Sequence, residues 1–312
     1  MAEERVYDLI IIGGGPAGLT AGIYATRGKL DTLLLERLNP GGLVASTELV
    51  ENYPGYPEGI VGAELIKKME EQAAKFGLQT MPYNEVTSVD LKSRIKSVKA
   101  DQQEYRSKAV IIASGTEPKK LNIPGEEKFK GKGVSYCATC DGAFFQGKDI
   151  AVIGAGSSGI QEGLFLTRFV NSITVVEFMP QMNAEKILQE RAQKESKFKF
   201  FLNHMVTSIN GENKVESITI KSRETGEEKT VPVAGVFVYV GWNPMTSFLK
   251  GQVDLDKWGY IIAGEDTKTS LPGVFAIGDV RQKILRQITT ATSDGTVAAF
   301  MVERYVEEFQ KD

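Results

Sequence analysis

Cysteine and histidine are scarce in this sequence of 312 residues, which has two cysteines, Cys137 and Cys140, and one histidine, His204. Two thiols cannot supply the framework of disulfides that holds many small secreted proteins together. A structural zinc site needs four ligands, so this small number of thiols and imidazoles argues against one. We therefore expect no bound metal.

The sequence also lacks an excess of charge and a long apolar run. Lysine and arginine number 37 against 40 aspartates and glutamates, a net charge of −3, so no basic surface for nucleic acid is expected. No stretch approaches the ~20 apolar residues of a membrane span. The first residues, MAEERVYDLIII, are too acidic and too briefly apolar for a secretory signal. These absences predict a cytoplasmic protein with neither a membrane nor a nucleic acid as partner.

Glycine is the residue in excess, with 32 of 312 positions, and its usual share is about 7%. The excess predicts tight turns and places where the backbone approaches a ligand closely. Hydrophobic residues at 42% and charged residues at 25% are ordinary for a globular protein. The length suggests two domains, since a domain has about 150 residues.

The first glycine cluster lies in the context that a dinucleotide-binding loop requires. An apolar strand over 6–12 leads into glycines, a helix is expected over 17–27, and a strand over 32–36 ends in an acid. Glycines let the backbone approach a pyrophosphate at a helix N-terminus. The acid then accepts hydrogen bonds from ribose hydroxyls. This pattern predicts that the dinucleotide is bound by Gly13, Gly15, Pro16, Ala17, Gly18 and Glu36.

The same pattern recurs 141 residues later in the chain. A strand over 149–153, a glycine turn, a helix over 161–169 and a strand over 173–177 repeat the first unit. The first glycine and the acid are 23 residues apart in both copies. The residues predicted to bind a second dinucleotide are Gly154, Gly156, Ser157, Ser158, Gly159 and Glu177.

Two segments with glycine and proline, 114–118 and 241–244, separate the copies, and strand patterns typical of the first half return after the second segment. We therefore predict an α/β protein with two Rossmann-like, three-layer dinucleotide-binding domains, the second inserted into the first. The first domain comprises residues 1–116 and 246–312, and the inserted domain comprises residues 117–245.

Both cysteines fall in the segment Cys137-Ala138-Thr139-Cys140-Asp141 of the inserted domain. A C-x-x-C pair is typical of a redox dithiol or of half a zinc site. With no further cysteine and a single histidine, the redox dithiol is the better interpretation. Because the thiolate is the reactive form, a proton has to be handled nearby. Asp141 is the candidate proton donor or acceptor, a role compatible with that of a helix cap.

The motif Cys-Ala-Thr-Cys-Asp-Gly between two dinucleotide-binding units resembles that of the low-molecular-weight thioredoxin reductases, and the similarity covers nearly the whole chain. The resemblance implies FAD in the first domain, a pyridine nucleotide in the second, thioredoxin or a similar redoxin as partner, and a homodimer. It also implies that Cys140 lies nearer the flavin with Cys137 as its disulfide partner. Which cysteine attacks the redoxin stays open. Further FAD-binding residues implied by the resemblance are Gly41, Gly42, Asn52, Ala113, Gly115, Gly278, Asp279, Arg286 and Gln287.

The mechanism of that family requires the inserted domain to move. A disulfide packed against a buried flavin cannot also meet a protein disulfide in solvent. We expect the hinges at 116–118 and 241–244.

The sequence departs from the family where the second strand ends. Family members that use NADPH carry His-Arg-Arg there, whereas this chain has Glu177-Phe178-Met179. An acid suits a free ribose 2′-hydroxyl, and an arginine suits a 2′-phosphate. Two like charges ~4 Å apart cost ~4 kcal/mol at an effective dielectric of 20, which disfavours NADPH by up to ~10³-fold. We predict NADH as the donor, as in the alkyl hydroperoxide reductase flavoprotein, which residues 177–188 resemble.

Other interpretations remain open at this point. Clostridial relatives with similar replacements take electrons from ferredoxin, so a nucleotide-independent donor is one alternative. A small-molecule dithiol oxidase would use the same flavin and cysteines, with oxygen as the acceptor. A flavin-binding protein without activity would need neither the dithiol nor Asp141, and ferredoxin–NADP reductases of similar architecture lack the paired cysteines.

Overall fold

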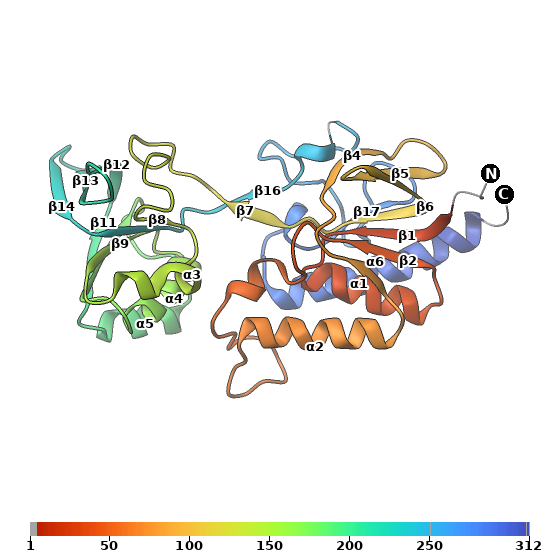
Figure 1. Ribbon diagram of the computed structural model, residues 1–312, viewed down its shortest axis with the longest axis horizontal. Helices are drawn as coiled ribbons and strands as arrows, with labels where there is room; N and C mark the ends of the chain where they lie inside the picture. Colours follow the sequence, from red (N-terminus) through yellow and green to blue (C-terminus); the bar gives the residue numbers. More distant parts are fainter. Residues whose placement is uncertain (1–4, 250, 310, 312) are drawn as a thin grey trace. The chain divides into compact units, whose positions relative to one another are not determined.

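The computed structural model describes residues 5–249, 251–309 and 311, and the chain divides into two compact units. Unit 1 comprises Met1–Glu117 and Asn243–Asp312, and unit 2 comprises Pro118–Trp242. The chain crosses between the units at two paired strands, β7 (Thr116–Pro118) and β16 (Trp242–Pro244), which Figure 1 shows side by side. The domain limits expected from the sequence, 116 and 246, fall one and three residues from these unit boundaries.

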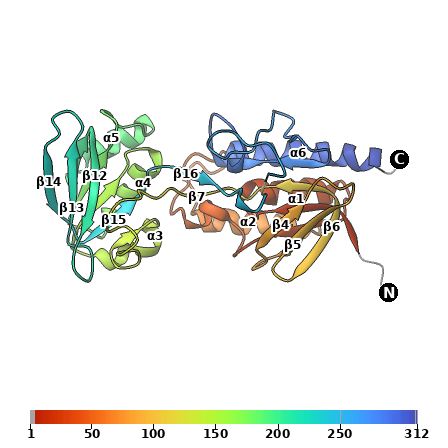
Figure 2. The same ribbon diagram turned by 90° about the horizontal axis from the view of Figure 1, so that it is seen from above.

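The main sheet of unit 1 has the order β3-β2-β1-β6-β5-β4. β17 pairs with the end of β6, along the edge opposite β1. β1, β2, β3, β6 and β17 run parallel, whereas β4 and β5 form an antiparallel extension that Figure 2 shows beside β6. The strands are β1 (Val6–Ile12), β2 (Thr32–Leu35), β3 (Gln79–Met81), β4 (Val86–Asp90), β5 (Lys96–Ala100), β6 (Gln103–Ile112) and β17 (Val274–Ala276).

Helices cover one face of this sheet, and they are α1 (Pro16–Arg27), α2 (Gly62–Lys75) and α6 (Ile288–Phe309). Side chains of β1 alternate between the two faces, as the period of a strand dictates. Leu9 and Ile11 join the core under the helices, whereas Ile10 and Ile12 join a second core on the opposite face. Because both faces are buried, the strand is apolar along its length, and that is the run visible in the sequence.

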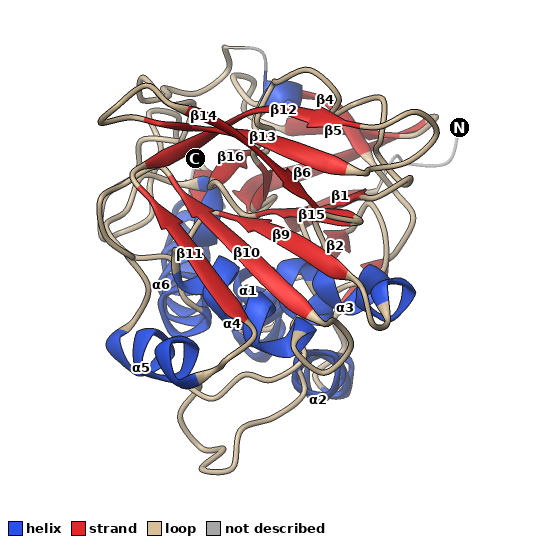
Figure 3. Ribbon diagram, turned by 90° about the vertical axis from the view of Figure 1, so that its left-hand side faces the viewer, coloured by secondary structure: helices blue, strands red, loops and turns tan. Residues whose placement is uncertain are grey.

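Unit 2 repeats the design with a parallel sheet of order β11-β10-β9-β15-β8. Its strands are β8 (Val134–Ser135), β9 (Asp149–Ile153), β10 (Ser172–Glu177), β11 (Phe198–Leu202) and β15 (Gly235–Val238). One face packs against α3 (Ala138–Asp141), α4 (Ser157–Leu166) and α5 (Lys186–Lys194). The other face packs against an antiparallel sheet of β12 (His204–Asn210), β13 (Ser217–Ser222) and β14 (Glu228–Pro232), as Figure 3 shows.

Both units turn from their first strand into the following helix in the same way. Gly13 and Gly154 have φ angles of +110° and +104°, a region that favours glycine. A Cβ on Gly18 would collide with the carbonyl oxygen of Gly13, and a Cβ on Gly159 would collide with that of Gly154. The first and last glycines of each loop, Gly13 and Gly18 in unit 1 and Gly154 and Gly159 in unit 2, are therefore required by backbone conformation or close packing. The predicted duplication is present in the two units.

One helix prediction was wrong in its limits. The helix expected over 161–169 begins at Ser157 and ends at Leu166 as α4. Ser157, Ser158 and Gly159 had the composition of a turn, but they form the first turn of the helix. The hydrogen bond from Ile160 N to Gly156 O, at 3.0 Å, already closes a helical turn over these residues. The fold class itself, two Rossmann-like three-layer units, is confirmed.

Candidate active site

The N-terminus of α1 has the form of a pyrophosphate site. No described side chain caps the helix at Gly15, and a Cβ added there would meet no atom within 4 Å. Pro16, Ala17 and Gly18 form the first turn, so the N–H groups of Ala17 and Gly18 have no partner within the helix. The carboxylate of Glu36 lies across the loop, accepting from Gly14 N at 2.7 Å and Leu38 N at 2.9 Å. Two backbone donors thus fix this carboxylate where a ribose would lie.

The structure brings other residues predicted to hold FAD to this same loop. Gly41 N donates to Gly14 O at 2.8 Å, and a Cβ on Gly42 would lie 3.7 Å from Gly15 Cα. Ala113 N donates to Ile12 O at 2.8 Å. Segments that are far apart in the sequence therefore meet at the end of β1.

The C-terminal residues predicted to hold FAD converge on the same region of unit 1. A Cβ on Gly278 would lie 3.0 Å from Ala17 Cβ. Arg286 Nε donates to the carbonyl oxygen of Asp279 at 3.2 Å, and Asn52 Nδ2 donates to Gln287 Oε1 at 3.1 Å across 235 residues of sequence. Burial raises the pKa of Asp279, a shift that Lys283 and Arg286 oppose. Gly115, the last of the residues predicted to hold FAD, has a φ of +68° just before β7.

A buried ionic cluster that the sequence did not reveal holds the turn at Gly278. Asp294 of α6 accepts from Gly278 N at 2.9 Å, from Arg281 Nε and Nη2 at 2.8 Å, and from Lys283 Nζ at 2.8 Å. Burial opposes the ionisation of Asp294, but the hydrogen bonds from Arg281 and Lys283 leave its pKa below the usual range. The cluster fixes the backbone next to Asp279. Nothing in the local sequence pointed to it, because its members lie on two elements.

Unit 2 reproduces the arrangement of Glu36 at its own glycine loop. The carboxylate of Glu177 accepts from Ala155 N at 2.5 Å and from Met179 N at 2.8 Å. Its side chain is buried. Gly156 has no described side-chain cap and open space at its Cβ position, as Gly15 has. Ser157 Oγ, at the first position of α4, accepts from Glu185 N at 3.1 Å.

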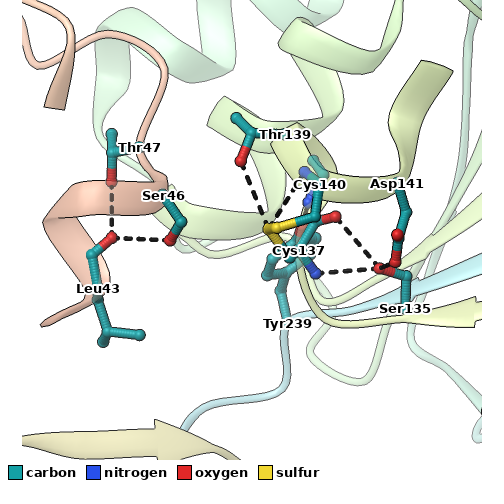
Figure 4. Close-up of a disulfide and its surroundings, with 10 residues drawn as sticks. Leu43, Ser46, Thr47, Ser135, Cys137, Thr139, Cys140, Asp141 and Tyr239 are labelled. Carbon is teal, nitrogen blue, oxygen red and sulfur yellow. Dashed lines mark hydrogen bonds between the residues drawn. A yellow bond between two sulfur atoms is a disulfide. The ribbon is translucent and has the colours of Figure 1, made fainter. Parts of the chain in front are cut away.

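The two cysteines form a disulfide at the start of α3, with 5.4 Å between their Cα atoms (Figure 4). Cys137 is the residue that caps the helix, and its sulfur accepts from Cys140 N at 3.3 Å. Thr139 Oγ1 lies 3.4 Å from the same sulfur. The Cys137 sulfur is therefore the better placed of the two to carry negative charge once the disulfide opens.

Asp141 is joined to the motif through a serine that the sequence analysis missed. Ser135 Oγ donates to Asp141 Oδ2 at 2.6 Å and accepts from Cys137 N at 3.1 Å (Figure 4). Tyr239, at the end of β15, accepts from Ala138 N at 3.1 Å. Burial raises the pKa of Tyr239 far above its usual value, so its hydroxyl stays protonated. Ser135 lies two residues from Cys137, but only the topology reveals Tyr239, about 100 residues away.

An open hollow of about 560 Å³ lies within unit 2 beside the disulfide. Its lining residues are Glu127, Lys130, Gly131, Val134, Ser135, Tyr136, Cys137 and Asp141. Across the part of the chain that the structure describes, no group of three or more His, Cys, Asp or Glu side chains is placed to hold a metal ion. No helix within those same residues has the length and apolarity to cross a membrane.

Two units of dinucleotide-binding design, one of which carries a disulfide at a helix start, define a dinucleotide-dependent disulfide oxidoreductase. Residues 7–295 match the model of the family described as pyridine nucleotide-disulphide oxidoreductase. The chain is 47% identical over 312 residues to the thioredoxin reductase of Bacillus subtilis (strain 168), covering 100% of this chain and 98% of that protein. It is 44% identical to a 34.2 kDa protein in the rubredoxin operon of Clostridium pasteurianum, covering 98% and 99%.

Solved structures agree with the sequence comparison. The thioredoxin reductase of Lactococcus lactis (FR conformation) matches with a TM-score of 0.95 and 43% identity, over 97% of this chain and 99% of that one. The T. acidophilum thioredoxin reductase matches with a TM-score of 0.92 and 39% identity, over 96% and 99%. The chain belongs to the pyridine nucleotide-disulphide oxidoreductase family, and within it to the low-molecular-weight thioredoxin reductases. The predicted family and the predicted enzyme class, an oxidoreductase acting on a sulfur group, are confirmed.

The family implies FAD and a nicotinamide cofactor, and the residues of unit 1 fit a dinucleotide. The open space at Gly15, the uncapped start of α1 and the fixed carboxylate of Glu36 together match the pyrophosphate and ribose of such a group. Unit 2 offers the same three features at Gly156, α4 and Glu177.

Proposed function

We propose that this protein is a thioredoxin-disulfide reductase that uses NADH. The overall reaction is NADH + H⁺ + thioredoxin disulfide → NAD⁺ + thioredoxin dithiol, with thioredoxin or a thioredoxin-like protein as partner. The observation that carries the proposal is the Cys137–Cys140 disulfide at the start of α3, beside the Ser135–Asp141 hydrogen bond. When bound, FAD supplies the two-electron chemistry that connects the nicotinamide to this disulfide.

The residues around Cys137 favour its charged form after the disulfide opens. Breaking the S–S bond with two electrons and one proton leaves one thiolate and one thiol. Cys140 N and Thr139 Oγ1 both lie within hydrogen-bonding reach of the Cys137 sulfur. Hydrogen bonds to a thiolate favour the charged state, so we assign the thiolate to Cys137 and the thiol to Cys140.

Asp141 is the group that transfers the proton in this exchange. Its Oδ2 is fixed by Ser135 Oγ, and its position next to Cys140 in the sequence keeps the carboxylate at the motif. In the exchange with the redoxin, a thiolate of this protein attacks the redoxin disulfide, forming a mixed disulfide and releasing a redoxin thiolate. The second cysteine, still a thiol, then gives its proton to Asp141 and attacks the mixed disulfide. This restores the Cys137–Cys140 bond and releases the redoxin sulfur, to which Asp141 passes that proton.

The structure supports NADH through the match between Glu177 and Glu36. Both carboxylates accept from one N–H of the glycine loop and one N–H two residues further along the chain. Because Glu36 lies in the unit where FAD, with its unphosphorylated ribose, is expected, the same geometry at Glu177 suits a free 2′-hydroxyl. A 2′-phosphate at this place would lie against a buried carboxylate.

Rapid mixing of the oxidised holoprotein with NADH, NADPH or reduced ferredoxin tests the donor, with the loss of flavin absorbance as the measurement. We expect fast bleaching by NADH and at least a hundredfold slower bleaching by NADPH at equal concentration, from the cost of placing two like charges together. Bleaching by NADPH with none by NADH would overturn the role of Glu177. Bleaching by ferredoxin alone would assign the nucleotide-independent donor instead.

Trapping tests the dithiol route. A Cys137→Ser or Cys140→Ser variant leaves one thiol, so a mixed disulfide with thioredoxin cannot be resolved and should accumulate on a non-reducing gel. The double variant is the control and should capture nothing. Full turnover by both single variants without any captured redoxin would contradict the mechanism, and peroxide formation from a small dithiol would favour the oxidase alternative. The homodimer and the cytoplasmic location remain predictions.

A further inference from the structure

Two large apolar side chains stand exposed directly after Glu177: Phe178 and Met179 are each 50% exposed. Arg223, the residue after β13, lies on the first of them, with its guanidinium carbon 3.6 Å from the centre of the Phe178 ring. Arg223 Nη1 donates to the carbonyl oxygen of Phe178 at 2.9 Å and to Asn203 Oδ1 at 3.3 Å. The guanidinium is therefore held against the ring by two acceptors.

This stacked pair is tied to the ribose carboxylate through the backbone of one residue. Met179 N donates to Glu177 Oε1 at 2.8 Å, and the carbonyl oxygen of Met179 accepts from Asn203 N at 2.9 Å. Asn203 also accepts from Arg223 N, at 2.9 Å, through its own carbonyl oxygen. The carboxylate, the aromatic ring and the guanidinium thus belong to one hydrogen-bonded frame at the ends of β10 and β11.

The position of this frame defines which part of a dinucleotide reaches it. The start of α4 takes the pyrophosphate on one side of the ribose that Glu177 binds. The base on that ribose then extends away from the glycine loop, over the residues that follow Glu177. Those residues are Phe178 and, stacked on it, Arg223.

We propose that Phe178 and Arg223 form the adenine-binding subsite of unit 2. A flat guanidinium and an aromatic ring both stack on a base, and a guanidinium prearranged by hydrogen bonds loses little freedom on binding. The inference rests on the proposed use of NADH and extends it to the part of the nucleotide that carries no chemistry. In unit 1, Arg37 directly follows Glu36 in the sequence. Each unit therefore has an arginine for the base next to its ribose-binding acid, although the two arginines come from different parts of the repeated pattern.

Arg223→Ala, Phe178→Ala and Arg223→Lys test the subsite. The probes are ADP-ribose, titrated calorimetrically into the oxidised holoprotein, and NADH and reduced nicotinamide mononucleotide as donors. The mononucleotide lacks the adenosine. We expect Arg223→Ala and Phe178→Ala each to weaken ADP-ribose and NADH about tenfold, from the usual strength of such stacking. Flavin reduction by the mononucleotide should stay unchanged.

Lys229→Ala is the matched control, because Lys229 lies over another aromatic ring of the same unit, with its Nζ 5.2 Å from the centre of the Phe201 ring. It should leave ADP-ribose binding as in the original protein. Unchanged binding in Arg223→Ala and Phe178→Ala would overturn the subsite while the use of NADH stands. An Arg223→Ala variant that loses only NADPH would also overturn it and assign a 2′-phosphate contact. A protein that neither binds ADP-ribose nor is bleached by NADH would overturn the proposed donor and the subsite together.

Discussion

The hydroxyl of Ser135 joins the two ends of the redox motif. It accepts from the backbone N–H of Cys137 and donates to the carboxylate of Asp141. Ser135 is 5% exposed, so water does not readily replace it. A hydrogen bond to a carboxylate fixes the direction in which its oxygens point. The residue that moves the proton is therefore positioned by one that touches no reacting sulfur.

Ser135→Ala should slow thioredoxin turnover about tenfold, since a hydrogen bond to a charged group contributes ~1.5–3 kcal/mol. The loss should appear in kcat and not in the KM for the redoxin, because Ser135 positions the carboxylate that moves the proton. The measurement is kcat and KM with the redoxin as the varied substrate. Ser172→Ala is the matched control, since Ser172 Oγ donates to Asp149 Oδ1 at 2.6 Å in the same unit. An unchanged kcat in the Ser135→Ala variant would limit Ser135 to a structural role.

The sequence could predict the reacting residues but not those that position them. Cys137, Cys140 and Asp141 lie within five consecutive positions, so a pattern along the chain identifies them. Tyr239 meets Ala138 because β15 pairs with β8, and that pairing is a property of the sheet order. No local rule connects residues whose contact depends on the order of strands.

The helix starts α1 and α4 are the elements on which both nucleotide predictions depend. Gly15 and Gly156 have φ angles of −73° and −77°, which any residue adopts, and neither has an atom within 4 Å of an added Cβ. Neither backbone strain nor packing requires glycine at these two positions. The close approach of a ligand is the remaining reason for their small size.

Gly15→Ala should therefore lower FAD affinity about tenfold without changing the stability of the apoprotein, because the methyl group occupies only the space of the ligand. Gly156→Ala should leave FAD content unchanged and weaken the nucleotide donor by a similar factor. FAD content after dialysis and the apparent Kd of NADH measure the two effects. Each variant serves as the control for the other. Equal loss of both ligands in both variants would contradict the assignment of one cofactor to each unit.

At the scale of elements, strands followed by glycine were the most predictable feature. β1 and β9 have the predicted limits, Val6–Ile12 and Asp149–Ile153, because buried parallel strands are apolar throughout. The antiparallel layer β12–β14 was not predicted. Its strands bury one face and expose the other, and buried Val206, Ile209, Ile218 and Ile220 are separated by polar residues that resemble a surface loop.

For the whole molecule, the duplication and the insertion were readable from the sequence, whereas the convergence of distant segments was not. Asn52 and Gln287 lie 235 residues apart and meet through one hydrogen bond. Such a contact requires β17 and α6 to return to the first sheet after unit 2 is complete. Asn52 and Gln287 were predicted to bind FAD only from the resemblance to the family. No physical argument from the sequence itself pointed to them.

The last prediction concerns the two places where the chain crosses between the units. We expect them to act as hinges that let unit 2 move during each catalytic cycle. Gly115 precedes β7 with a φ of +68°, and Gly241 precedes β16 with a φ of +115°; an added Cβ meets no atom within 4 Å at either place. No neighbouring atom requires glycine at either position. What glycine provides there is backbone freedom, and a hinge needs that freedom.

Gly241→Ala should slow turnover with thioredoxin several-fold, because an L-residue resists a positive φ and restricts the paths open to the backbone. Gly77→Ala is the matched control, since Gly77 has a φ of +91° and the same open space at the end of α2. Both variants should lose about 1–2 kcal/mol of unfolding free energy in urea, the usual cost of such strain. Only Gly241→Ala should lose turnover, because only that strain lies where the chain crosses between units. Equal turnover in the two variants would show that the crossing at Gly241 is a passive link.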